Sequence, residues 1–175
     1  MRILFLEPPR RTWPYMNFDD NYLTKQAYLC LASAVRSWGN HQPEILDCMP
    51  LKMGWKSLKG ELLRRRPDVV AVGENHAMYA DEALKALQLA KEVLPQVITI
   101  AGGAHFTHLA DTYLGFDNPK RSSLPPPWFT PIKTPVIDYI VKGEGERTLT
   151  ELLDWLESSS LPPLELPGIV FAHQG

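Results

Sequence analysis

Short apolar runs alternate with longer amphipathic segments along the chain, which is the pattern of strands alternating with helices in a parallel sheet. Five of the apolar runs have the length of strands, and they cover residues 3–6, 44–47, 69–73, 97–101 and 136–141. The run at 69–73 is apolar throughout, as expected of a central strand that is covered on both faces. The pattern therefore predicts five strands that lie side by side.

Apolar residues at helical spacing follow each of these strands. The predicted helices cover residues 25–38, 57–65, 81–94, 109–114 and 147–157. In the segment 81–94, an acidic residue stands at the start and a leucine and alanine stripe ends before Pro95, as is typical of a surface helix. Together the elements predict an α/β fold, with an open, doubly wound sheet of five parallel strands flanked by helices.

Two regions interrupt the alternation. Residues 115–135 contain six prolines, which exclude regular helix or strand, and we expect a long surface insert there. Residues 158–163 are rich in serine and proline, and a short strand-like run at 168–171 follows them. We predict one domain over residues 1–157. We interpret residues 158–175 as a linker and a short strand that lead into an absent catalytic domain, and a terminal edge strand is the alternative.

Composition narrows the classes of partner. The 175 residues carry a net charge of −2 and the isoelectric point is about 6.2, so no basic field for nucleic acid is expected. No apolar run approaches the roughly 20 residues of a membrane span, and Glu7 follows the first run too soon for a signal peptide. We therefore expect a cytoplasmic protein with no membrane partner. Cys30 and Cys48 lack the close spacing of metal or redox sites and are predicted to be reduced core residues.

Loops follow the carboxyl ends of four predicted strands, where open α/β sheets bind ligands. Glycines in two of these loops would let a ligand reach the backbone amides, because no Cβ stands in the way. Tight strand-to-helix turns are the structural alternative for the same glycines. The candidate cofactor-binding residues in the four loops are Glu7, Pro8, Glu74, Asn75, His76, Gly102, Gly103, Ala104, His105, Gly143, Glu144, Gly145 and Glu146.

Histidines follow two of the predicted strands. His76 and His105, with Glu74 nearby, suit metal ligation or acid–base chemistry, and a histidine that bonds to backbone at a helix N-terminus is the structural alternative. The second glycine loop lacks the third glycine of a dinucleotide fingerprint. No Gly-x-Ser-x-Gly elbow is present, which argues against a hydrolase of that type.

Five segments occur in an order that resembles the N-terminal cobalamin-binding domain of the cobalamin-dependent radical S-adenosylmethionine enzymes. The segments are ILFLEPP at 3–9, PDVVAVG at 67–73, AGGAHF at 101–106, IDYIVKGEGE at 137–146 and LPGI at 166–169. The resemblance covers nearly the whole chain. It implies a Rossmann-like or flavodoxin-like doubly wound domain that holds cobalamin at the carboxyl ends of its strands.

The resemblance also implies that a longer parent protein contains a second, catalytic domain. In that family a following radical domain binds a 4Fe–4S cluster and S-adenosylmethionine through a three-cysteine motif, and many members transfer methyl groups while others cyclise or rearrange. This chain has only two cysteines. The cluster and S-adenosylmethionine are therefore expected only in an absent catalytic domain of the same parent chain.

One departure from the wider set of cobalamin proteins concerns the cobalt ligand. An Asp-x-His-x-x-Gly motif after the first strand supplies that histidine elsewhere, whereas residues 7–12 of this chain contain none. We expect base-off cobalamin, with water or no ligand below the cobalt, or with His76 as the cobalt ligand. Two alternatives are a stand-alone small-molecule enzyme that uses His76, His105 and Glu74, and a module that only docks domains through the aromatic segment 13–28 and the insert.

Overall fold

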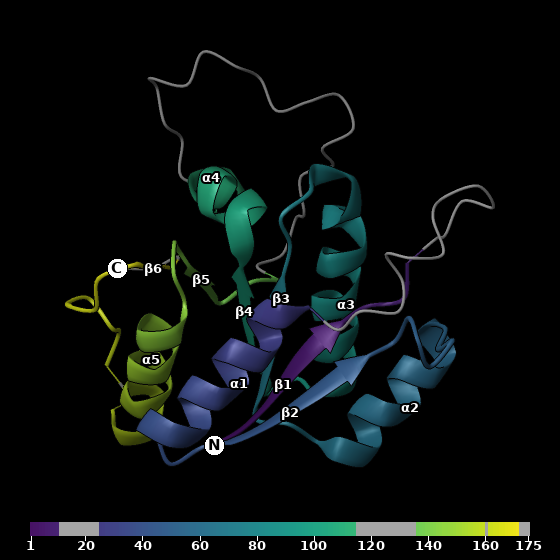
Figure 1. Ribbon diagram of the computed structural model, residues 1–175, viewed down its shortest axis with the longest axis horizontal. Coiled ribbons are helices and arrows are strands. Elements are labelled where there is room, and N and C mark those ends of the chain that lie inside the picture. Colours follow the sequence, from purple (N-terminus) through teal and green to yellow (C-terminus); the bar gives the residue numbers. More distant parts are fainter. Residues whose placement is uncertain (11–24, 115–135, 160, 172–175) are drawn as a thin grey trace.

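A computed structural model of the chain describes residues 1–10, 25–114, 136–159 and 161–171. Within these residues the strands form a six-stranded sheet in the order β2-β1-β3-β4-β5-β6 (Figure 1). The strands are β1 (Arg2–Glu7), β2 (Gln42–Asp47), β3 (Val69–Gly73), β4 (Ile98–Gly102), β5 (Tyr139–Val141) and β6 (Ile169–Val170). β1 to β5 are parallel, and β6 pairs antiparallel with β5.

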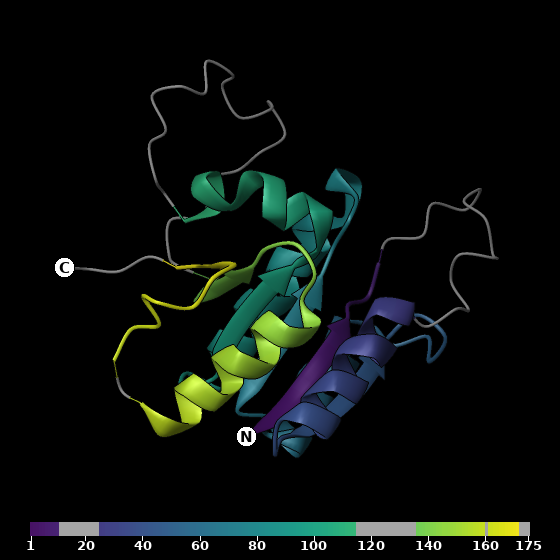
Figure 2. The same cartoon turned by 60° about the vertical axis from the view of Figure 1, so that its left-hand side comes forward.

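Helices cover both faces of the sheet. They are α1 (Gln26–Trp38), α2 (Trp55–Arg65), the short 3₁₀ helix η2 (Ala77–Tyr79), α3 (Ala80–Val93), α4 (Gly103–Tyr113) and α5 (Glu146–Ser158). Figure 2 shows α1 and α5 side by side on one face of the sheet, and α2, α3 and α4 contribute to the core on the other face. The predicted doubly wound α/β fold is confirmed.

The order of the strands reverses between β1 and β3. From β1 the chain passes outward to β2, and it then returns to build β3, β4 and β5 on the other side. Side chains of β1 are buried alternately on the two faces, with Ile3 and Phe5 under α1 and α5 and Leu4 and Leu6 under the opposite helices. An apolar strand is what this central position requires. The gap between the carboxyl ends of β1 and β3 is the topological switch point, where such sheets bind ligands.

The main differences from the prediction concern β6, β5 and α4. The sheet has a sixth, antiparallel strand, which is the short run that the sequence left open as an edge strand. β5 begins at Tyr139 because the Asp138 carboxylate, one residue earlier, accepts a hydrogen bond from Thr99 N at 2.7 Å. α4 begins at Gly103, six residues before the predicted helix 109–114, and its backbone is kinked at Leu109.

The prediction that both cysteines lie in the core is wrong for Cys30. Cys48 is buried, and burial raises the pKa of its thiol to about 12. Cys30 is exposed, because α1 turns its Tyr28, Ala32 and Val35 face toward the sheet and leaves positions 29 and 30 on the outside.

Some predictions fall outside the described residues. The proline-rich insert 115–135 and most of the aromatic segment 13–28 belong to this group. In the ranges that the structure does describe, no helix combines the length and the apolarity that a membrane span requires.

Candidate functional site

The switch point is filled by four charged side chains that neutralise one another. Glu7 ends β1 and Glu74 follows β3, and both carboxylates are almost completely buried. Arg10 forms ion pairs with both, at 2.8 Å to Glu74 Oε2. Lys25 Nζ lies 2.8 Å from Glu7 Oε2 and 3.3 Å from Glu74 Oε2. Two acids and two bases thus meet where the strands diverge, and we call them the switch-point network.

Within this network, burial has the largest effect on the pKa of Glu7. Desolvation raises the pKa of the Glu7 carboxyl, and the nearby charges of Lys25 and Arg10 oppose that rise. The Arg10 guanidinium also lies 3.9 Å from the centroid of the Tyr79 ring. Since each charge has a partner of opposite sign, the network presents no free cation to a phosphate at this point.

The turns after β3 and β4 are bonded to each other. Asn75 Oδ1 accepts a hydrogen bond from Ala104 N at 3.0 Å, and Glu74 O accepts one from His105 N at 3.1 Å. Gly103 has a φ of +85°, and a Cβ at this position would lie 2.6 Å from Glu74 O. The glycine at 103 is therefore required by the close packing of the two turns, which is the structural alternative that the sequence left open.

A cavity of about 510 Å³ lies beside the network, between α1 and α5 over the sheet. Its floor is apolar and is made by side chains from four strands, namely Phe5, Ala71, Ile100 and Val141. Leu31 and Leu149 add apolar walls from the two helices. The volume and the apolar lining are typical of sites for small organic ligands.

The rim of the cavity is polar and lies at the carboxyl edge of the sheet. Lining residues here come from the loops after β3, β4 and β5 and from the start of α4, and they are Asn75, Gly102, Gly103, Ala104, Thr107, His108, Gly143, Glu144, Gly145 and Glu146. Thr107 Oγ1 accepts a hydrogen bond from Gly143 N at 3.3 Å, which joins α4 to the loop before α5. Gly143 has a φ of +72°, and a Cβ there would meet nothing within 4 Å. Unlike Gly103, this glycine faces open space.

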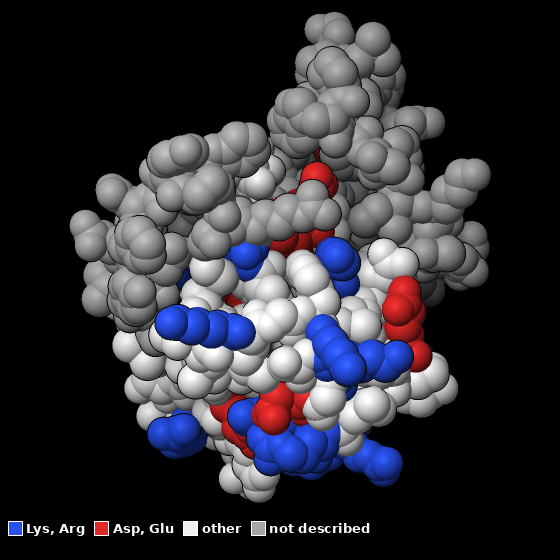
Figure 3. All heavy atoms as spheres, turned by 90° about the vertical axis from the view of Figure 1, so that its right-hand side faces the viewer, with Lys and Arg blue, Asp and Glu red and all other residues white. Residues whose placement is uncertain are grey.

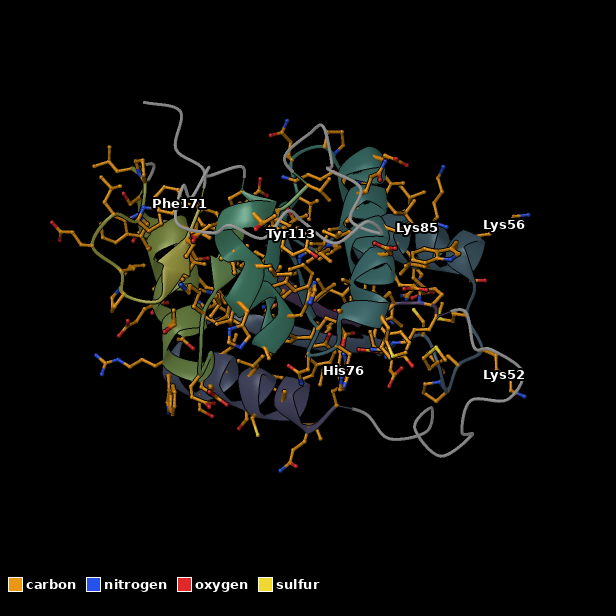
Figure 4. All side chains as sticks on the ribbon, turned by 90° about the horizontal axis from the view of Figure 1, so that it is seen from above. Lys52, Lys56, His76, Lys85, Tyr113 and Phe171 are labelled. Atoms are coloured by element: carbon orange, nitrogen blue, oxygen red, sulfur yellow. The ribbon has the colours of Figure 1, made fainter. Side chains whose placement is uncertain are left out.

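Five of the predicted cofactor-binding residues do not line the cavity. They are Glu7, Pro8, Glu74, His76 and His105. The two glutamates belong to the switch-point network next to it. His76 is exposed at the carboxyl edge between β3 and α3, as Figure 4 shows.

His105 is held by a different set of neighbours. Its Nε2 lies 2.7 Å from Tyr113 Oη, and its ring packs edge-on against Phe106 and Tyr113. Burial lowers the pKa of His105 and raises that of Tyr113 to about 12, so both groups are kept neutral. Because His105 is bonded to Tyr113 and Glu74 is bonded to cations, the arrangement gives no support to the acid–base set that the sequence suggested.

Several cavity residues were not among the predicted cofactor-binding residues. Ala27, Tyr28 and Leu31 of α1 and the preceding Lys25 form one wall, and His108 lies on the rim. Their positions depend on how α1 and α4 are rotated against the sheet. The only available signal was the helical spacing of residues 25, 28 and 31–32, which marks one face of the predicted helix.

Many Lys and Arg side chains lie on a face of the molecule that does not include the cavity. Figure 3 shows Lys and Arg side chains spread over the face formed by α2 and α3, and Figure 4 places Lys52, Lys56 and Lys85 on that side of the molecule. Among the described residues that line the cavity, Lys25 is the one Lys or Arg, and it is ion-paired. In the part of the chain that the structure describes, no three His, Cys, Asp or Glu side chains gather as metal ligands.

Comparison with known proteins gives distant relatives of greater length. No protein-family model matches the chain. The chain is 29% identical over 141 residues to an uncharacterised methyltransferase of Pyrococcus horikoshii, covering 80% of this chain and 25% of that protein. It is 28% identical over 154 residues to the anaerobic magnesium-protoporphyrin IX monomethyl ester cyclase of Rubrivivax gelatinosus, covering 87% and 24%. The chain therefore spans about a quarter of the length of the curated relatives it matches.

Two solved structures share the fold over 99% of this chain. One is the radical S-adenosylmethionine methyltransferase TsrM from Kitasatospora setae with tryptophan and a S-adenosylmethionine analogue bound, at a TM-score of 0.68 and 19% identity over 29% of that chain. The other is the cobalamin-dependent S-adenosylmethionine radical enzyme OxsB with aqua-cobalamin bound, at a TM-score of 0.67 and 17% identity over 21% of that chain. Both likenesses concern the fold.

Proposed function

We propose that this chain is a cobalamin-binding module that serves a radical S-adenosylmethionine enzyme. The cavity between α1 and α5 is the observation that carries the proposal, because it opens at the carboxyl edge of the sheet beside the switch point. The shared fold with TsrM and with OxsB, whose structure holds aqua-cobalamin, supports the same assignment. So do the relatives that are called a methyltransferase and a cyclase.

The lining of the cavity fits cobalamin better than it fits a dinucleotide. An apolar floor suits a buried aromatic base, and the loop after β5 offers backbone at Gly143 with open space above it. Glu144 and Glu146 stand on the rim, and the ammonium of Lys25 is already paired. A ligand with several phosphates would meet acidic side chains and no free cation among the described lining residues, whereas cobalamin has one phosphodiester and many neutral amide arms.

Different residues would then hold different parts of the cofactor. Phe5, Ala71 and Ile100 would contact the buried tail, and the rim from Gly102 to Gly145 would meet its polar groups. When bound, cobalamin supplies a cobalt centre that can carry an alkyl group. His76 is exposed at the same edge and is our candidate cobalt ligand, so His76→Ala should alter the absorption spectrum of the bound cofactor if it ligates.

The rest of the reaction would belong to another part of the parent protein. We propose that the 4Fe–4S cluster and S-adenosylmethionine bind a catalytic domain of the same parent chain, and that methyl transfer or cyclisation takes place there. This chain covers 24–25% of the first two curated relatives, which leaves ample length in proteins of that kind for such a domain.

An anaerobic titration with hydroxocobalamin, followed by absorption spectroscopy, tests the proposal. We expect saturable binding with a base-off spectrum, because residues 7–12 offer no histidine in place of the nucleotide base. Binding that does not saturate, or that leaves the spectrum of free cofactor unchanged, would contradict the proposal.

A pair of variants on α1 places the binding in the cavity. Ala27 is exposed on α1 and lines the cavity, so Ala27→Trp should fill the entrance and weaken binding. Ser33 is exposed on the same helix and lies outside the cavity, so Ser33→Trp is the matched control. Equal affinities of the two variants would show that the cofactor binds elsewhere.

A further inference from the structure

The hydrogen-bonded pairing of β1 with β3 ends one step before the carboxyl edge. The last pair is Phe5 with Ala71, and the next bond of a parallel ladder would run from Gly73 N to Leu6 O. The hydroxyl of Tyr28 lies in that place instead. Gly73 N donates to Tyr28 Oη at 2.9 Å, and Tyr28 Oη donates to Leu6 O at 3.0 Å. A side-chain hydroxyl from α1 thus replaces one rung of the ladder.

The buried environment of Tyr28 keeps its hydroxyl protonated. Its side chain is completely buried, with the ring 5.9 Å from that of Phe5, and burial raises its pKa well above the usual value for tyrosine. The hydroxyl therefore stays protonated and can donate and accept at once. Both of those bonds go to backbone, so Tyr28 has no donor left to offer a ligand.

Lys25 holds the other backbone group of Gly73. Lys25 Nζ donates to Gly73 O at 2.7 Å, and it also lies close to the carboxylates of Glu7 and Glu74. The ammonium thus donates hydrogen bonds to Gly73 O and to Glu74 Oε2, and it forms an ion pair with Glu7. Gly73, the last residue of β3, is thus bonded to Tyr28 through its N–H and to Lys25 through its C=O. It is not bonded to β1.

These bonds fix the wall of the cavity. Lys25, Tyr28 and Gly73 all line it, and Phe5 and Ala71 at the end of the paired region form its floor. If the Tyr28 hydroxyl were absent, Gly73 N and Leu6 O would be free to pair directly, which would draw β3 toward β1 and move α1 with it. The width of the cavity at its mouth depends on a hydroxyl inserted between two strands.

We propose that Tyr28 and Lys25 are positioning residues of the ligand site, which hold the strands apart at the switch point so that the cavity admits its ligand. The inference rests on the proposed function, because it takes the cavity to be the cobalamin site. In this role both side chains act through the backbone of Gly73.

Tyr28→Phe removes the hydroxyl and keeps the ring. In a crystal structure of this variant we expect the Gly73 N to Leu6 O distance to fall to about 2.9 Å, the usual length of a backbone hydrogen bond. We expect its affinity for hydroxocobalamin to fall roughly tenfold. Tyr113→Phe is the control, because it also removes a tyrosine hydroxyl that forms a partly buried hydrogen bond, at 2.7 Å to His105, but Tyr113 lies outside the cavity.

Each result decides a separate question. Unchanged affinity in Tyr28→Phe, or an equal loss in Tyr113→Phe, would overturn the positioning role. If the distance from Gly73 N to Leu6 O does not shorten in Tyr28→Phe, the hydroxyl is not what keeps these two groups apart. This measurement needs no ligand. If the wild-type chain binds no cobalamin, the proposed function fails while the crystal structure still tests the rung. Lys25→Met, with a side chain 28% exposed, provides the same affinity test if Tyr28→Phe does not fold.

Discussion

The carbonyl oxygen of Glu74 lies against Gly103 so closely that a β-carbon there would be 2.6 Å away. The left-handed φ of +85° adds a second reason for glycine. Two turns at the carboxyl edge of the sheet are therefore locked together by backbone contact. This contact explains why a glycine next to the cavity serves the fold more directly than it serves a ligand.

Gly103→Ala should lower the free energy of unfolding by about 2–4 kcal/mol, because it combines a left-handed strain of about 1–2 kcal/mol with overpacking against Glu74 O. Gly143→Ala is the control. It has a similar φ of +72° but open space around its Cβ, so it should lose only about 1–2 kcal/mol. Urea unfolding of the two variants measures the difference, and equal losses would show that the contact with Glu74 carries no cost.

Asn75→Ala should destabilise the chain by about 0.5–2 kcal/mol, because it leaves Ala104 N without the side-chain acceptor that it has at the start of α4. Asn75→Asp keeps an acceptor at the same place and should recover most of the loss. Thermal unfolding of the three proteins checks this, and the idea is wrong if the aspartate variant is no more stable than the alanine variant.

The alternation of strands and helices was predictable because it depends on residues close together in sequence. The apolar run 69–73 and the amphipathic segment 81–94 correspond to β3 and α3 to within about one residue. A parallel sheet follows from that alternation, and the carboxyl edge follows from the sheet. The rim glycines at 143 and 145 could be found for the same reason.

The roles that the sequence did not predict depend on tertiary packing. The rotation of α4 decides that His108 lies on the rim while His105 turns toward Tyr113. The hydroxyl of Tyr28 acquires its function only where β1 and β3 diverge. Neither the direction in which a helix turns a side chain nor the end of a strand ladder is encoded within a short stretch of sequence.

Glu7 should give the chain a pH-dependent stability that Glu7→Gln lacks. Burial raises its pKa in the folded state above its usual value of 4.5, so its contribution is fully present below pH 4.5 and is lost as the pH rises through the raised pKa. The stability of the wild type relative to Glu7→Gln should therefore fall as the pH rises above 4.5. Urea unfolding at several pH values measures this difference.

Glu61 should give a pH dependence of stability that is opposite in sign to that of Glu7. Hydrogen bonds from Arg64 and Arg65 lower its pKa to about 2, so its contribution is present above pH 4.5 and is lost as the pH falls toward 2. The wild type should lose its advantage over Glu61→Gln on acidification. Parallel curves for Glu7→Gln and Glu61→Gln would contradict both assignments.

His105 should behave as a structural residue when it is replaced by glutamine. Burial lowers its pKa below 6.5, so the folded state favours the neutral ring, and its contribution is present above pH 6.5 and is lost as the pH falls through the lowered pKa. The stability of the wild type relative to His105→Gln should therefore fall on acidification from pH 7.5. Because the ring contacts Tyr113 and does not line the cavity, affinity for hydroxocobalamin should stay at the wild-type value. A stability difference that stays constant with pH would contradict the buried neutral ring, and a loss of affinity would return His105 to the ligand site.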